Sequence, residues 1–199
     1  MERKDVEIIA REAAYDGYFR IDRYRVRYRR YDGDWTKEVS REVFERGHVA
    51  AVLPYDPERD AVVLIEQFRI GAWAAGKPCW LTEIVAGVID EGETAEAVAR
   101  REMEEETGCP VADLEAIGSY LSSPGGASEC VTLYVGRVDS RTAGGVHGLA
   151  EESEDIKVLV RPWAEVEAAL KAGLFTNAAT LIALQWLALN RAELRARWR

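Results

Sequence analysis

The stretch from Gly87 to Cys109, GVIDEGETAEAVARREMEEETGC, constrains the fold more than any other part of the chain. Thr94 is a preferred helix N-cap residue, and Gly108 suits the left-handed position that ends a helix. The pattern therefore predicts a helix over residues 94–107 with one buried stripe. Because apolar, strand-like segments lie on both sides of it, we expect an α/β fold.

This helix concentrates negative charge at its C-terminal end. Glu102, Glu105 and Glu106 stand at i, i+3 and i+4, so their carboxylates share one face. Like charges repel there, and the helix dipole is also negative at that end. Arg101 can orient a glutamate from beside the cluster, and a hard divalent cation such as Mg²⁺ or Mn²⁺ can neutralise the rest. By composition alone, a solvated acidic helix face would be the better interpretation.

The remaining segments predict one mixed sheet with helices around it. Residues 1–45 read as β structure, with Tyr24, Val26 and Tyr28 alternating with a row of arginines. Apolar runs predict strands within 48–69 (two), 79–87, 114–121, 130–139 and 156–160, and helices at 163–172 and about 177–198. We therefore expect an N-terminal β region, 1–45, and an α/β sandwich domain, 46–199.

Composition excludes several classes of protein. The chain is 48% hydrophobic and 31% charged, as in soluble globular proteins, and no run approaches the ~18–20 apolar residues of a membrane span. It shows no signal peptide, and its three cysteines form no CxxC pair, so we expect a reduced, cytoplasmic setting. The net charge of −9 argues against nucleic-acid binding and means that an anionic substrate would need a mediating cation.

The acidic helix resembles the Nudix box, which reads G, five residues, E, seven residues, then R-E-U-x-E-E-x-G-U, with U apolar. The seven fixed positions are Gly87, Glu93, Arg101, Glu102, Glu105, Glu106 and Gly108. A chance match is on the order of 10⁻⁸ per starting position if each residue type has a frequency of ~6–7%. Cys109 in the last apolar slot is a mild departure that affects packing rather than chemistry.

The resemblance implies a metal-dependent hydrolase of nucleoside diphosphate derivatives, built on a mixed sheet sandwiched between helices. Pro124, fifteen positions after Cys109, looks like the proline that marks the ADP-ribose pyrophosphatase branch of this family. Further similar segments, such as VVLIEQFRI and NAATLIALQWL, extend the resemblance over nearly the whole chain. It implies Mg²⁺-dependent hydrolysis of ADP-ribose to AMP and ribose 5-phosphate by a homodimer.

Site residues follow from the same resemblance. The metal ligands fall on the main-chain oxygen of Ala86 and on Glu102, Glu106 and Glu154, with Glu105 as a secondary contributor. The general base falls on Glu152, and Glu151 or Glu154 stay open as alternatives. Substrate contacts fall on Arg41, Glu42, Arg46, Arg69, Val88, Ser123, Pro124, Gly125 and Glu129. Tyr18 and Phe19 match an aromatic pair that reaches the adenine from the partner subunit, which would make residues 1–45 an exchanged dimerisation element.

Other interpretations stay open at this point. The substrate could be another nucleoside diphosphate sugar, such as ADP-glucose or GDP-mannose, or the chain could be a sensor that binds ADP-ribose without cleaving it. Such sensors usually lose box glutamates, and this chain keeps them. Without the resemblance, Arg41 and Arg69 could pair with surface acids, and Tyr18 and Phe19 could belong to a core.

Overall fold

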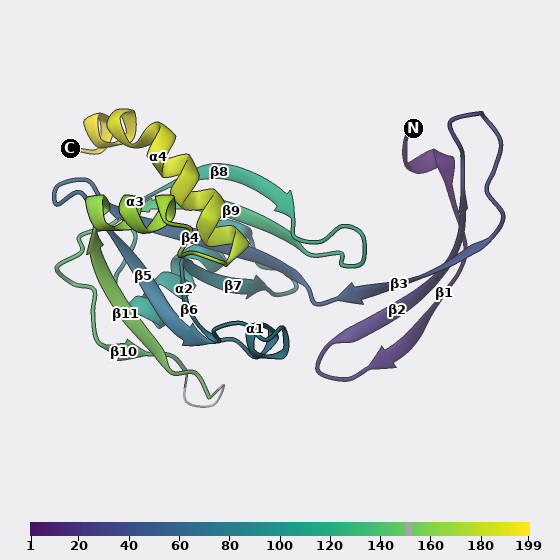
Figure 1. Cartoon of the computed structure of the whole chain (residues 1–199), viewed down its shortest axis with the longest axis horizontal. Coiled ribbons are helices and arrows are strands. Elements are labelled where there is room, and N and C mark those ends of the chain that lie inside the picture. Colours follow the sequence, from purple (N-terminus) through teal and green to yellow (C-terminus); the bar gives the residue numbers. More distant parts are fainter. Residues whose placement is uncertain (150–152) are drawn as a thin grey trace. The chain divides into compact units, whose positions relative to one another are not determined.

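The computed structural model describes residues 1–149 and 153–199, and Figure 1 labels its elements. The chain divides into two compact units. The first comprises Met1–His48 with Leu121–Cys130, and the second comprises Val49–Tyr120 with Val131–Arg199. Within the described residues, no helix is both long and apolar enough to cross a membrane.

The first unit is built on a three-stranded antiparallel sheet. Its strands, in the order in which they pair, are β1 (Val6–Asp16), β2 (Arg20–Tyr28) and β3 (Val39–Glu45), preceded by a 3-10 turn η1 (Arg3–Asp5). This confirms the β structure predicted for the N-terminal region. The segment 121–130 joins this unit through Phe44, whose N–H donates to the Gly126 carbonyl at 2.8 Å. The exchange of residues 1–45 between subunits stays a prediction.

Among its described residues, the second unit is built on a mixed sheet of eight strands with four helices. The strands are β4 (His48–Asp56), β5 (Ala61–Phe68), β6 (Trp80–Glu83), β7 (Val85–Ile89), β8 (Asp113–Leu121), β9 (Cys130–Arg137), β10 (Val146–His147) and β11 (Ile156–Pro162). The helices are α1 (Ile70–Ala74), α2 (Ala95–Thr107), α3 (Trp163–Lys171) and α4 (Ala178–Trp198). The path β10-β11-β5-β4-β9-β8 is mixed, because β4 pairs antiparallel with β5 and parallel with β9.

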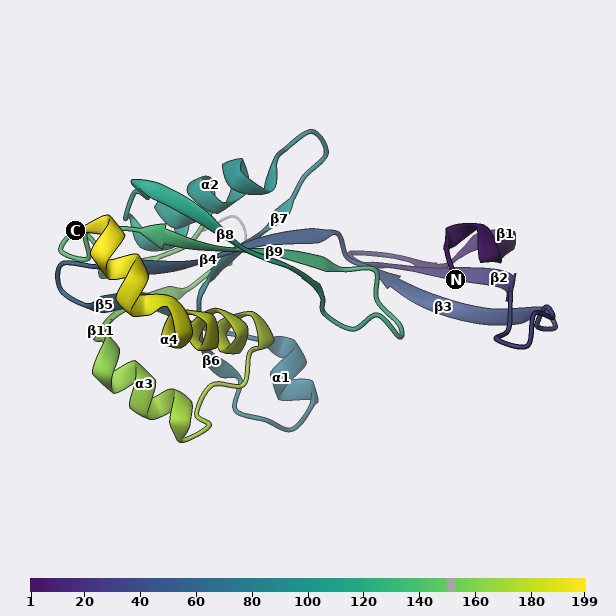
Figure 2. The same cartoon turned by 90° about the horizontal axis from the view of Figure 1, so that it is seen from above.

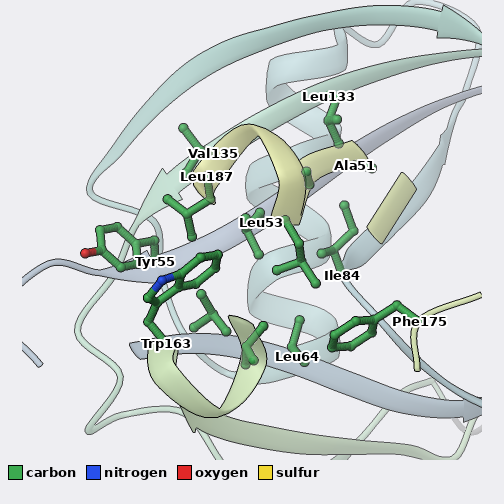
Figure 3. Packing of buried hydrophobic residues seen from close by; sticks show 14 of the residues in the cluster. Ala51, Leu53, Tyr55, Leu64, Ile84, Leu133, Val135, Trp163, Phe175 and Leu187 are labelled. Carbon is green, nitrogen blue, oxygen red and sulfur yellow. The ribbon is translucent and has the colours of Figure 1, made fainter. Parts of the chain in front are cut away.

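Both faces of the two central strands are covered by helices. Along β4, Leu53 and Tyr55 belong to a core cluster that contains residues of α3 and α4, such as Trp163 and Leu187 (Figure 3). The alternate residue Val52 belongs to a second cluster on the other face, with residues of α2. Figure 2 shows α2 on one side of the sheet and α3 and α4 on the other. The predicted sheet between helices is therefore confirmed.

The apolar run at 79–87 differs from its prediction as one strand. It forms two short strands with different partners, because β6 pairs with β5 and β7 pairs with β4. Ile84 lies between them, 1% exposed, and donates its N–H to the Thr180 hydroxyl at 3.1 Å. The short helix α1 and the two-residue strand β10 were also not predicted. An apolar run indicates burial, but it does not indicate which strand is the partner.

Candidate active site

The helix α2 begins and ends where its sequence predicts. The Thr94 hydroxyl accepts a hydrogen bond from the Ala97 N–H at 3.2 Å, which satisfies one of the free donors of the first turn. Gly108 ends the helix in the left-handed conformation, with φ 64°, and donates its N–H to the Glu104 carbonyl. The helix buries Val98, Ala99 and Met103 together with two polar residues, Glu106 and Thr107.

Arg101 gathers three acidic residues of the box. Its Nη1 donates to Glu102 Oε1 at 2.7 Å and to Glu105 Oε2 at 2.9 Å, and its Nε donates to Glu93 Oε1 at 3.4 Å. One guanidinium therefore offsets part of the charge of the cluster from its side. This is the orienting contact that the sequence predicts for Arg101.

Glu106 is a buried acidic residue of the same helix, and Glu102 beside it is half-buried. Glu106 is 3% exposed, and one carboxylate oxygen accepts the Ala86 N–H at 3.3 Å. Burial raises the pKa of Glu106 well above its usual range, and the charges of Glu102 and Glu154 raise it further, against the opposing effects of the Ala86 N–H and Arg69. Burial also raises the pKa of Glu102. The fold therefore holds acidic groups where their ionised form is unfavourable without a cation.

Gly87 provides the space that Glu102 occupies. A Cβ at this position would lie 1.9 Å from Glu102 Oε1 and 2.1 Å from its carboxyl carbon, much closer than atoms can approach. Any larger residue here would force the Glu102 side chain or strand β7 to shift. Gly87, the first fixed residue of the box, therefore contributes by having no side chain where Glu102 lies.

Glu154 is held within its own loop. Its carboxylate accepts the Leu149 N–H at 3.1 Å, and Gly148, with φ 110°, lies against its Cβ. The charge of Glu154 acts on both Glu102 and Glu106, because it raises the pKa of each carboxyl group. The predicted base, Glu152, and its alternative Glu151 lie outside the described residues.

The described carboxylates do not gather into one metal-binding cluster. Within residues 1–149 and 153–199, no three Asp, Glu, His or Cys side chains form a group that could hold a metal ion. Each predicted ligand instead has a protein donor: Arg101 for Glu102, the Ala86 N–H for Glu106 and the Leu149 N–H for Glu154. The predicted ligand set therefore stays a prediction, and the secondary ligand Glu105 is bound to Arg101.

Most of the predicted substrate contacts lie in the first unit. Phe19 stacks edge-on against Tyr18 and Phe44, with ring centroids 4.7 and 5.0 Å away, and the Arg46 guanidinium lies 6.0 Å from the Phe19 ring. Arg46 Nη1 is 2.8 Å from the buried Glu129 carboxylate. Tyr18 is 95% exposed, which argues against the alternative that this pair is core.

The other predicted contacts of this unit lie on β3 and in the adjoining loop. Glu42 forms an ion pair with Arg23 at 3.1 Å, and Arg41 donates to the Ser40 carbonyl at 2.8 Å. The Ser123 carbonyl accepts N–H groups from Gly126 and Ala127, which folds the loop that carries Pro124 and Gly125.

Arg69 and Val88 are the predicted contacts that lie in the second unit. Val88 is 40% exposed, and the Arg69 side chain is 43% exposed. Arg69 binds the buried Glu83, with its Nη2 2.9 Å from Glu83 Oε2. The sequence reasoning missed Glu83, although one acidic residue inside the apolar run CWLTEIVAG was a signal for a buried, paired carboxylate.

Comparison with known proteins decides the family. The NUDIX domain family matches residues 45–188. The chain belongs to the Nudix family. This Nudix chain is 51% identical to the ADP-ribose pyrophosphatase of Escherichia coli K12 over 196 residues. The aligned region covers 98% of this chain and 94% of the relative.

One further relative has a different named substrate, and one solved structure shows a similar fold. The GDP-mannose pyrophosphatase of Cronobacter sakazakii is 36% identical over 187 residues, which is 94% of this chain and 96% of the relative. A crystal structure of an ADP compounds hydrolase matches with a TM-score of 0.73 at 19% identity, covering 98% of this chain and 99% of that chain. This structural likeness shows that the Nudix chain shares the fold of that hydrolase.

Proposed function

We propose that this Nudix chain hydrolyses the pyrophosphate bond of ADP-ribose to AMP and ribose 5-phosphate. The observation that carries the proposal is the buried carboxylate of Glu106 together with the half-buried carboxylate of Glu102, which packs against Gly87. The substrate follows the E. coli relative, named ADP-ribose pyrophosphatase and 51% identical over nearly the whole chain.

The donor set supports a hard divalent cation as cofactor, Mg²⁺ with Mn²⁺ as a substitute. Carboxylate and carbonyl oxygens are the ligands such ions prefer, and the raised pKa values of Glu102 and Glu106 mark a charge cost that a cation would relieve. The residues proposed to hold it are Ala86 through its carbonyl oxygen, Glu102, Glu106 and Glu154, with Glu105 as a secondary contributor. When bound, the cation supplies charge neutralisation at the phosphates and lowers the pKa of water.

The rest of the chemistry is assigned to side chains of this chain. Glu152 accepts the proton of the attacking water, and this role rests on the family resemblance alone, with Glu151 and Glu154 as alternatives. Arg69 lies within electrostatic reach of Glu106, which supports a role for its guanidinium at the phosphates. Tyr18 and Phe19 are proposed to hold the adenine.

The protein is proposed to act as a homodimer formed through its N-terminal sheet. Val6 pairs with Tyr28 and Ile8 with Val26 across β1 and β2, and three of these large side chains are exposed by 42–54%. A row of exposed apolar side chains on a sheet is typical of an interface.

The free thiols of Cys79, Cys109 and Cys130 support the proposed cytoplasmic setting.

A steady-state assay tests the function directly. Purified protein is incubated with ADP-ribose, ADP-glucose or GDP-mannose, with Mg²⁺ or with excess chelator, and the released phosphomonoesters are identified. We expect AMP and ribose 5-phosphate from ADP-ribose only when metal is present, with the highest kcat/KM of the three substrates. Faster cleavage of GDP-mannose would support the second candidate function, which the Cronobacter relative's name suggests. Binding of ADP-ribose without product would instead indicate a sensor.

A further inference from the structure

Glu83 is a buried carboxylate to which the box and its chemistry assign no role. It ends strand β6 and is 2% exposed. Arg69 donates to Glu83 Oε2 through Nε at 3.0 Å, with Nη2 at 2.9 Å from the same oxygen. Gln67 Nε2 lies 3.5 Å from Oε2, and Asn177 Nδ2 donates to the other oxygen, Oε1, at 2.9 Å. A residue this deeply buried and this fully bonded is held in one orientation.

The three described residues bonded to the Glu83 carboxylate, Gln67, Arg69 and Asn177, all act as hydrogen-bond donors. An ionised carboxylate accepts at both oxygens, whereas an amide in its place would present an NH₂ group to donors in either orientation. The site therefore requires the charged acceptor, and a buried charge requires its cation, Arg69.

The orientation of Asn177 is itself fixed by helix α4. Its Oδ1 caps the helix by accepting the Thr180 N–H at 3.0 Å, so its amide nitrogen must point away from the helix end, toward Glu83. The Thr180 hydroxyl accepts the Ile84 N–H at 3.1 Å. The first turn of α4 thus holds both Glu83 and the residue after it.

This arrangement holds Arg69 within electrostatic range of the buried Glu106. Glu83 binds Nε and Nη2 along one edge of the guanidinium, and among the described residues Nη1 has no protein acceptor. The charge of Arg69 acts on the buried Glu106, whose carboxylate binds the Ala86 N–H three residues beyond Glu83. Glu83 therefore fixes the orientation of the Arg69 guanidinium. It also lies at the start of the segment that leads to the Nudix box at Gly87.

We propose that Glu83 is a positioning residue for the hydrolysis reaction, holding Arg69 with one guanidinium edge free for a phosphate of the substrate, and that Asn177 holds Glu83 in turn. The inference rests on the proposed function. According to this inference, Glu83 and Asn177 affect substrate binding because they position Arg69. Their effect on binding does not arise from a change in the stability of the fold.

A double-mutant cycle separates these two effects. The variants Glu83→Gln, Arg69→Ala and the double variant are assayed with ADP-ribose and Mg²⁺, and thermal unfolding is measured for each. We expect Glu83→Gln to lower kcat/KM by about ten-fold, chiefly through KM, and to cause less than about a two-fold further loss when Arg69 is already Ala. The surface variant Glu115→Gln, which changes the partner of Arg197, is the matched control and should behave as wild type.

A second variant covers the case in which Glu83→Gln fails to fold. Asn177→Ser keeps a good N-cap for α4 but removes the amide that donates to Glu83, so it should raise KM in a protein that still folds, with a lower melting temperature because one buried carboxylate oxygen loses its donor. Equal losses from Glu83→Gln in both backgrounds, or an unchanged KM in Asn177→Ser, would overturn the inference while leaving the proposed function intact. A wild-type protein that cleaves no ADP-ribose would instead overturn the proposed function and the inference with it.

Discussion

At the scale of single residues, Gly87 is a position where one added atom should have a large effect. Replacing it by Ala would place a Cβ 1.9 Å from Glu102 Oε1, so Glu102 or strand β7 must move. Because a displacement of about 1 Å at a reacting centre can cost on the order of 100-fold in rate, we expect kcat for ADP-ribose to fall by about that factor, with weaker activation by Mg²⁺. Titration of activity with Mg²⁺ measures both effects.

The chain offers a matched control for this substitution. Gly71, in α1, has no atom within 4 Å of an added Cβ and no positive φ. Gly71→Ala should therefore keep wild-type kinetics. If Gly87→Ala were equally active, Glu102 would not be needed in the place that the structure gives it.

Glu106 leads to a second prediction at the same scale, about pH and stability. Its pKa is raised in the folded protein, so without metal its contribution to stability is favourable at low pH and is lost as pH rises from about 4.5 through the folded value. At neutral pH the metal-free variant Glu106→Gln should therefore melt higher than the wild type. The gain should be about 2–4 °C for each 1 kcal/mol, and it should shrink as pH falls.

Added metal should reverse this order. A cation that binds the folded wild type stabilises it by mass action, while Glu106→Gln lacks one of the proposed ligands. Melting curves at several pH values, with chelator or with Mg²⁺, test the sign directly. The same rank order in both conditions would argue against Glu106 as a metal ligand.

At the scale of elements, the caps of α2 connect the sequence with the position of the cluster. Thr94→Ala removes the hydroxyl that accepts the Ala97 N–H, and the loss of such a cap costs about 1 kcal/mol. We expect urea unfolding to show this loss for Thr94→Ala and little change for Thr94→Ser, which keeps the acceptor. A larger loss in the serine variant than in the alanine variant would show that the hydroxyl does not act as a cap.

The helices and strands also show how much of the fold could be predicted from the sequence alone. The helix α2 was predictable to within a residue, because its start, its end and its buried stripe are all local signals. The separation of β6 from β7 was not, because it depends on Ile84 bonding to Thr180, 96 positions along the chain. Within the candidate site, the contact of Arg101 with Glu102 follows from adjacency, whereas the contact of Arg69 with Glu83 depends on the pairing of β5 with β6.

At the scale of the whole molecule, the proposed exchange between subunits can be tested by mixing two inactive variants. Glu106→Gln disables the carboxylate cluster, and Phe19→Ala removes part of the proposed adenine contact. If Phe19 serves the partner's site, a mixed dimer contains one site with both features intact. Random exchange makes half of the dimers mixed, so about a quarter of the wild-type activity should return in the whole mixture, and about half in the isolated mixed dimers.

The opposite topology gives a different result in the same experiment. If Phe19 serves its own subunit, each mixed dimer combines one site without Glu106 and one site without Phe19, and mixing restores nothing. The subunits must be allowed to exchange, by dilution or mild denaturant, and the mixed species isolated through two affinity tags before assay. Recovery only after exchange would support the exchanged dimer, while activity equal to the average of the two parent variants would show that each subunit completes its own site.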